Sequence, residues 1–215
     1  MPSQAAQILR HPSHDRILDE AEALFASRGY SGTGLSELAE RAGLSKSTLF
    51  HHFPSKTEIY AAVMERLFAS LLGRVEERLD TTAGPLERIE TIVDLWTGFV
   101  VEHQGRATLF LRGLVEREFE DEGLTREYMM KRHGVYVLRL IQIVTSTVDE
   151  GIAKGLFRPQ PAAHFLQTLI GATLFHFASG PFGQDLIGGD IFSDRNVEAR
   201  KREMKDFVRA GLLKK

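Results

Sequence analysis

The sequence feature that most restricts the possible fold of this chain is a pair of very short helical patterns joined by a single glycine, between Thr33 and Pro54. The first pattern ends at Gly43, where a left-handed residue is easiest to place, and Ser45 can cap the second pattern, which Pro54 ends. The apolar residues at helical spacing are Leu35, Leu38, Ala39, Ala42, Leu49 and Phe53. Two helices of this size across a tight turn predict a helix-turn-helix unit.

The rest of the chain shows helical patterns and no competing strand alternation. A first helix ends near Gly29, and Ser55 with Glu58 forms a capping box that opens a long helix. Further helices are predicted over residues 86–103, 106–118, 125–154, 161–179 and 197–210, with loops over 155–160 and 180–194. The predicted fold class is therefore all-α.

Composition limits the kind of protein. The chain has 215 residues, 43% of them hydrophobic, and no cysteine, so a disulfide framework and a thiolate metal site are excluded. No signal-peptide pattern or membrane span of about 20 apolar residues is present, and we expect a cytoplasmic protein.

Charge placement favours DNA as a local partner. The net charge of −2 argues against a general polyanion binder, yet no acidic residue lies between Glu40 and Glu58. The basic or titratable residues in that interval are Arg41, Lys46, His51, His52 and Lys56. If the helix after Gly43 enters a major groove, its leading residues Ser45 to Thr48 meet base edges and phosphates.

The stretch TGLSELAERAGLSKSTLFHHFPSKTEIY, residues 33 to 60, resembles the DNA-binding signature of TetR-type transcriptional regulators. The resemblance implies that Thr33 caps the second helix against a phosphate and that Lys56 holds the DNA backbone. The candidate DNA contacts are Thr33, Ser36, Ser45, Lys46, Ser47, Thr48, Phe50, His51, His52 and Lys56. Two departures, Phe50 for a common tyrosine and Gly34 for a frequent threonine, remove possible phosphate contacts. The resemblance divides the chain into a DNA-binding domain, residues 1–58, and a regulatory domain, residues 59–215.

A two-fold dimer is expected, because one helix-turn-helix makes few base contacts whereas a dimer contacts both halves of a palindrome. The resemblance places the dimer interface on the last two long helices. The candidate interface residues are Phe165, Leu169, Ala172, His176, Met204, Phe207 and Val208. Packing within the chain is the alternative interpretation of each apolar position.

A ligand site is expected in the regulatory domain. The candidate residues are Trp96, Phe99, His103, Phe110, Leu114, Tyr136, Leu140, Thr173 and Phe175. This wall is mostly apolar and aromatic, which suits a largely hydrophobic inducer held by one or two hydrogen bonds from His103, Tyr136 or Thr173. No cluster of Arg or Lys appears among them, which disfavours a multiply charged phosphate ligand. The alternative is that these aromatic residues fill the core.

Other functional classes have little support. No Walker loop, GxSxG, HExxH or cysteine nucleophile is present, so we predict no enzyme and no cofactor. His51 and His52 point about 100° apart on a helix and cannot easily share a metal ion. A DNA-binding architectural protein without a ligand remains the alternative, with an all-helical enzyme behind it. Between repressor and activator we favour a repressor, although the position of the operator decides the sign.

Overall fold

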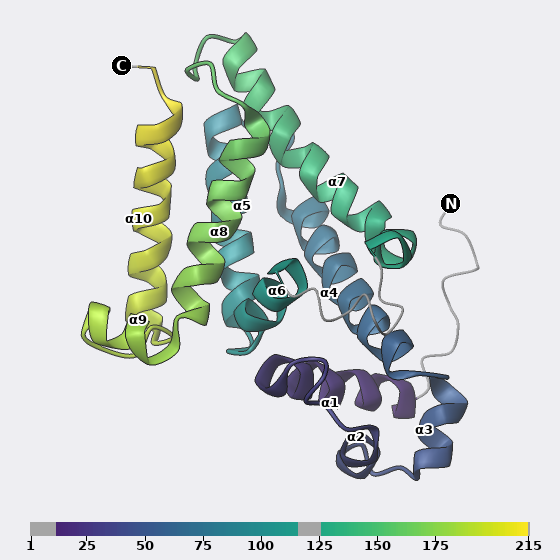
Figure 1. Ribbon diagram of the computed structural model, residues 1–215. Helices are drawn as coiled ribbons and strands as arrows, with labels where there is room; N and C mark the ends of the chain where they lie inside the picture. Colours follow the sequence, from purple (N-terminus) through teal and green to yellow (C-terminus); the bar gives the residue numbers. More distant parts are fainter. Residues whose placement is uncertain (1–11, 116–125, 215) are drawn as a thin grey trace.

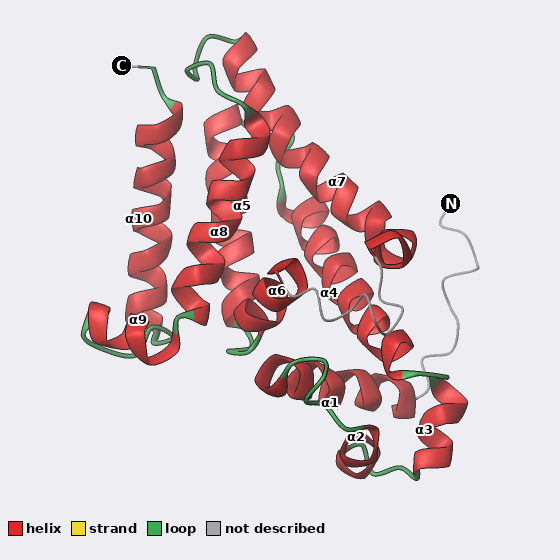
Figure 2. Cartoon of the chain, in the orientation of Figure 1, coloured by secondary structure: helices red, strands yellow, loops and turns green. Residues whose placement is uncertain are grey.

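The computed structural model describes residues 12–115 and 126–214, and every regular element in these ranges is a helix (Figures 1 and 2). The helices are α1 (Pro12–Arg28), α2 (Leu35–Arg41), α3 (Lys46–His52), α4 (Lys56–Arg78), α5 (Pro85–Val101), α6 (Arg106–Val115), α7 (Arg126–Ala153), α8 (Ala162–Ala178), α9 (Gly180–Ile187) and α10 (Asp194–Leu212). Within the described ranges, strand-like pairing is limited to an isolated bridge between Phe157 and Leu213. The predicted all-α fold is confirmed.

The helix-turn-helix forms where the local sequence predicts it. Gly43 has φ +67°, a left-handed conformation that costs a residue with a β-carbon about 1 kcal/mol or more. The Leu44 amide donates to Ala39 O at 2.9 Å, which closes the turn after α2. Ser45 caps α3, and Ser55 caps α4 by accepting a hydrogen bond from the Glu58 amide at 3.1 Å. These contacts place α2 and α3 at one end of the molecule (Figure 1).

The long helix α4 runs from this end into the rest of the protein and packs against α1 and α7. Helix α1 also packs against α6, and the approach is close: a β-carbon on Gly105 would lie 2.5 Å from that of Ala26. One hydrophobic core continues from α1 through α4 to Phe110 and Phe177. The helix-turn-helix end and the regulatory helices therefore share packed side chains.

Helices α5, α8 and α10 lie side by side, with α10 on the side of the molecule away from α4 and α7 (Figure 1). A second core gathers apolar residues of α5, α7, α8 and α10. Ion pairs between Asp94 and Lys205 at 2.9 Å and between Glu90 and Arg209 at 2.6 Å set α5 and α10 antiparallel. The described helices include none that is long and apolar enough to span a membrane.

The predicted loop over residues 180–194 is partly wrong, because α9 occupies its first half. Pro181 lies in the first turn of α9, where a missing amide hydrogen costs little, and Gly188 ends the helix at φ +76°. Clustered Gly and Pro residues indicate a loop, whereas here they mark the two ends of a short helix. Residues 116–118 and 125 of the predicted helices lie outside the described ranges.

Candidate nucleic-acid interface

Helix α3 has one buried face and one exposed face. Leu49 is fully buried, and Phe53, which follows the helix, is almost so; both belong to the core that includes α1. The exposed residues are Lys46, Ser47, Phe50 and His51. The helix is therefore held from behind and presents a polar and aromatic surface outward.

The hydroxyl groups at the start of α3 bond to one another. Ser45 Oγ accepts from the Thr48 amide at 3.1 Å and lies 2.8 Å from both Ser47 Oγ and Thr48 Oγ1. This cap orders the first turn of the helix. Lys46 has no ion-pair partner among the described residues, and its Nζ lies 6.0 Å from the centre of the Phe50 ring. Its ammonium group is therefore not neutralised by a described carboxylate.

Lys56, at the start of α4, is held beside α1 and α2. Its Nζ lies 3.5 Å from the Thr33 carbonyl oxygen and 4.4 Å from the Tyr30 ring centre. The predicted phosphate contact of Thr33 is wrong, because the side chain is buried and its hydroxyl donates to Gly29 O at 2.7 Å. Gly34 is the N-cap of α2, without a side-chain cap.

The remaining candidate contacts differ in exposure. Ser36 is exposed in the first turn of α2, and His51 is exposed on α3. His52 is half-buried, with its ring centre 6.4 Å from that of His14 on α1. Arg41 Nε donates to Glu20 at 2.7 Å, so Arg41 adds less positive charge to this surface than the sequence indicated.

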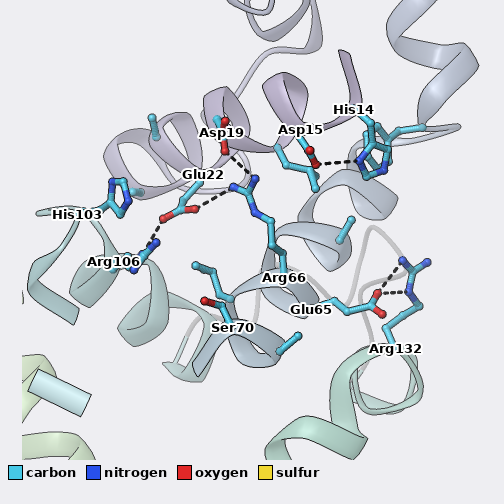
Figure 3. Close-up of a pocket in the computed structure, with 18 of the residues that line it drawn as sticks. His14, Asp15, Asp19, Glu22, Glu65, Arg66, Ser70, His103, Arg106 and Arg132 are labelled. Carbon is cyan, nitrogen blue, oxygen red and sulfur yellow. Dashed lines mark hydrogen bonds and ion pairs between the residues drawn. The ribbon is translucent and has the colours of Figure 1, made fainter. Parts of the chain in front are cut away.

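A groove lies beside this unit, between α1, α4, the start of α6 and α7 (Figure 3). Its volume is about 1140 Å³. Glu22 Oε1 accepts from Arg106 Nε at 2.8 Å, and Glu22 Oε2 accepts from Arg66 Nη2 at 3.1 Å. Arg106 also bonds Glu102; the hydrogen bond from Arg74, with that from Arg106, lowers the pKa of the Glu102 carboxyl. The groove is thus lined by paired charges.

A second ionic cluster joins α7 to the first turns of α4. Arg132 donates to Glu58 at 2.6 Å and to Glu65 at 3.1 Å, and the Tyr128 hydroxyl donates to Glu58. Burial, together with the hydrogen bond to Glu58, raises the pKa of Tyr128. Sequence reasoning missed both clusters. The position of Glu22 among the inward-facing residues of α1 could have indicated a buried ion pair. Its partners could not be identified from the sequence, because they lie 44 and 84 residues away.

The predicted ligand residues do not form one site. His103 and Tyr136 line the groove, whereas Phe99, Phe110 and Thr173 are buried in the interior. Trp96 and Leu140 are partly buried against the first core. The prediction is wrong for Phe175, which is 61% exposed on the outer side of α8, and the side chain of Leu114 lies outside the described part.

The predicted dimer residues also divide. Leu169, Met204 and Val208 are buried in the second core, so their assignment to a dimer interface is wrong. They pack inside the chain because the α8 and α10 faces that carry them turn toward α5. Phe165 and Ala172 pack against the same core, and His176 is half-buried. Of the seven candidate residues, Phe207 alone is exposed, with 57% of its surface accessible.

Together, a capped short helix with an exposed basic face, a glycine turn and a larger helical second part define a helix-turn-helix DNA-binding protein. A model of the bacterial regulatory proteins of the tetR family matches residues 17–63. The helix-turn-helix part of the chain therefore matches the tetR family of regulators.

Individual relatives support this assignment. Over 103 residues the chain is 37% identical to the transcriptional activator FasR of Mycolicibacterium smegmatis, a match that spans about half of each protein, 47% of both. It is 29% identical over 162 residues to the repressor KstR2 of the same organism, which covers 74% of this chain and 71% of KstR2. The structure of FadR from Bacillus subtilis in complex with stearoyl-CoA shares the fold, with a TM-score of 0.72 at 16% identity over 92% of this chain and 98% of FadR.

Proposed function

We propose that this protein is a homodimeric transcriptional regulator that binds a palindromic operator through α3 and is released by a small, largely hydrophobic ligand. Residues 1–58 bind DNA, and residues 59–215 bind the ligand and the second subunit. The exposed face of α3 carries this proposal: its back is anchored by Leu49 and Phe53, while Lys46 has no described carboxylate partner. A helix held in this way can enter a major groove without losing its own packing.

The dimer forms through the exposed side of α8, α9 and α10. Large apolar side chains are exposed there, namely Phe175, Phe182, Leu186, Ile187 and Phe207. Clusters of exposed apolar residues of this kind mark association surfaces in soluble proteins. This surface replaces the buried Leu169, Met204 and Val208 as the proposed interface.

The ligand site lies among the regulatory helices. A chain of rings joins Trp96 to Phe110 at 5.7 Å, Phe110 to Phe68 at 5.4 Å and Phe68 to His133 at 5.0 Å. Trp96 Nε1 and His133 Nδ1 are buried and have no hydrogen-bond partner among the described residues. Burial, with Arg132 nearby, lowers the pKa of His133 and favours its neutral form. Apolar walls with a few polar atoms suit a largely hydrophobic ligand that carries one or two hydrogen-bonding groups.

The comparisons suggest an acyl chain as the buried part of such a ligand. FadR, whose fold this chain shares, is described in complex with stearoyl-CoA. The four rings of this wall are uncharged, and the guanidinium of Arg132 nearby is paired with Glu58 and Glu65, so only the apolar part of an acyl thioester fits there. Repression and activation are both compatible with this scheme, because the position of the operator decides whether the bound protein represses or activates transcription. We favour a repressor that the ligand releases from its operator.

A linked titration tests the proposal. The operator is first selected from random DNA by the purified full-length chain, and stearoyl-CoA binding is then measured with and without it. A ligand that favours the DNA-free form must bind more weakly when operator is present, by the same factor by which it weakens operator binding. Trp96→Ala should weaken stearoyl-CoA binding, whereas Leu138→Ala on the exposed side of α7 should not. Equal ligand affinity in the two titrations would rule out stearoyl-CoA as an inducer.

A further inference from the structure

Phe50 is the one large hydrophobic side chain exposed between residues 12 and 78, the described part of the first four helices. It is 41% exposed, whereas its neighbours Leu49 and Phe53 are buried. Single exposed apolar residues are common on protein surfaces and need no explanation by themselves. This ring, however, stands on the helix face proposed to meet DNA, among polar residues.

The position of Phe50 on α3 is fixed relative to Lys46. The two residues are four apart, so they lie on the same side of the helix. Lys46 Nζ lies 6.0 Å from the ring centre, which places the ammonium group over the ring. Lys46 stands about 6 Å nearer the start of the helix, a distance of one to two base pairs at about 3.4 Å each. The pair presents a cation and an apolar ring to neighbouring positions in a groove.

The major groove offers few apolar groups to such a ring. Its base edges carry hydrogen-bond donors and acceptors, with the C5 methyl group of thymine as the apolar exception among the four bases. A phenyl ring pressed against a polar base edge would remove water from donors or acceptors and give no hydrogen bond in return. Because Phe50 lacks a hydroxyl group, it has no route to a phosphate hydrogen bond either.

We propose that Phe50 is a specificity-determining residue that selects thymine at one position of each half-site through contact with its C5 methyl group. Lys46 donates to a base edge or phosphate one or two base pairs away. This inference rests on the proposed function, since it requires α3 to enter the major groove.

Uracil substitution tests the contact on the unmodified protein. Each thymine of the selected operator is replaced in turn by uracil, which keeps base pairing and removes only the methyl group, and affinity is measured by fluorescence anisotropy at fixed salt. Loss of one buried methyl group should weaken binding about fourfold, and loss of both symmetry-related groups about fifteenfold. Uracil at the other thymines should change affinity less than twofold.

Variants assign the effect to the residue. Phe50→Ala should bind thymine and uracil operators alike, whereas the control variant His51→Ala, at the next exposed position of α3, should keep the difference. Because Phe50 is exposed, both variants should keep the unfolding midpoint of the unmodified chain. A sensitive thymine that stays sensitive in Phe50→Ala, or an operator with no sensitive thymine, would overturn the assignment and leave the proposed function standing. Failure of the unmodified chain to select any DNA would overturn both.

Discussion

The carboxylate of Glu22 lies between two guanidinium groups from other parts of the chain, Arg66 on α4 and Arg106 on α6 (Figure 3). Glu22 and Arg106 are both almost fully buried. Arg106 also donates to Phe99 O at 3.0 Å, and its guanidinium lies 4.5 Å from the Phe99 ring centre. The side chain of Arg106 thus contacts α1, which packs against the helix-turn-helix unit, and an aromatic residue of the regulatory core.

The first prediction concerns the stability supplied by this contact. Glu22→Gln keeps the shape but leaves two guanidinium groups without their shared carboxylate, and we expect the free energy of unfolding to fall by about 2 to 3 kcal/mol. The control is Asp19→Asn, since Asp19 pairs with the same Arg66 at 2.6 Å but its side chain is 69% exposed. That change should cost less than about 1 kcal/mol. Urea unfolding measures both, and equal losses would contradict the central role of Glu22.

The second prediction separates two lysines at the DNA surface. Loss of a base contact from Lys46 should cost about 1 to 3 kcal/mol and relax preference at one operator position. Loss of Lys56 should weaken binding to all sequences alike. It should also reduce the slope of the logarithm of the binding constant against the logarithm of salt concentration by about one, the value for one phosphate contact. Binding of Lys46→Ala and Lys56→Ala to operator variants over a range of salt concentrations measures both effects. Equal, sequence-independent losses would show that Lys46 contacts only the DNA backbone.

The third prediction tests the surface proposed for dimerisation. Phe207→Glu on α10 should convert the dimer to a monomer, because a charge would enter an apolar interface without a partner. Leu138→Glu is the control, since Leu138 is equally exposed on α7, outside that surface. Sedimentation equilibrium at micromolar concentration distinguishes the two variants. A monomeric unmodified chain, or a dimer that survives Phe207→Glu, would contradict the assignment.

The fourth prediction concerns pH. Burial, with Arg200 nearby, lowers the pKa of His176 to about 4, against about 6.5 in an unfolded chain. Between these values the unfolded state binds more protons, so the free energy of unfolding should fall as pH decreases from about 6.5 toward 4. His176→Gln should lose less stability between pH 7 and pH 5 than the unmodified chain. The exposed His164→Gln, on the same helix, should behave like the unmodified chain, and identical profiles for all three would refute the prediction.

The parts of the fold that could be predicted from the sequence are those decided by residues close together along the chain. Ser45, Ser55 and Gly43 act on groups three to five residues away, so the caps and the turn could be predicted without tertiary information. The orientation of α8 could not be predicted in this way. Leu169 and Phe175 are both apolar, yet one is buried and the other exposed, because the helix is apolar on more than one side.

The candidate site shows the same division. The exposure of α3 followed from the buried spacing of Leu49 and Phe53. The burial of Thr33 did not, because its hydroxyl bonds to the preceding Gly29 carbonyl rather than capping α2. The partners of Glu22 lie on helices far along the chain, and their positions depend on how α4 and α6 pack.

Selection of binding sites from random DNA by the purified full-length chain tests the central claim most directly. A dimer that places one α3 in each half-site should enrich an inverted repeat whose half-site centres lie about 34 to 36 Å apart, one turn of DNA, or a multiple of it. Footprinting of the enriched sequence should protect both halves together, and Lys46→Ala should change the enriched bases. Enrichment of no sequence, or of a single unrepeated site, would contradict the account.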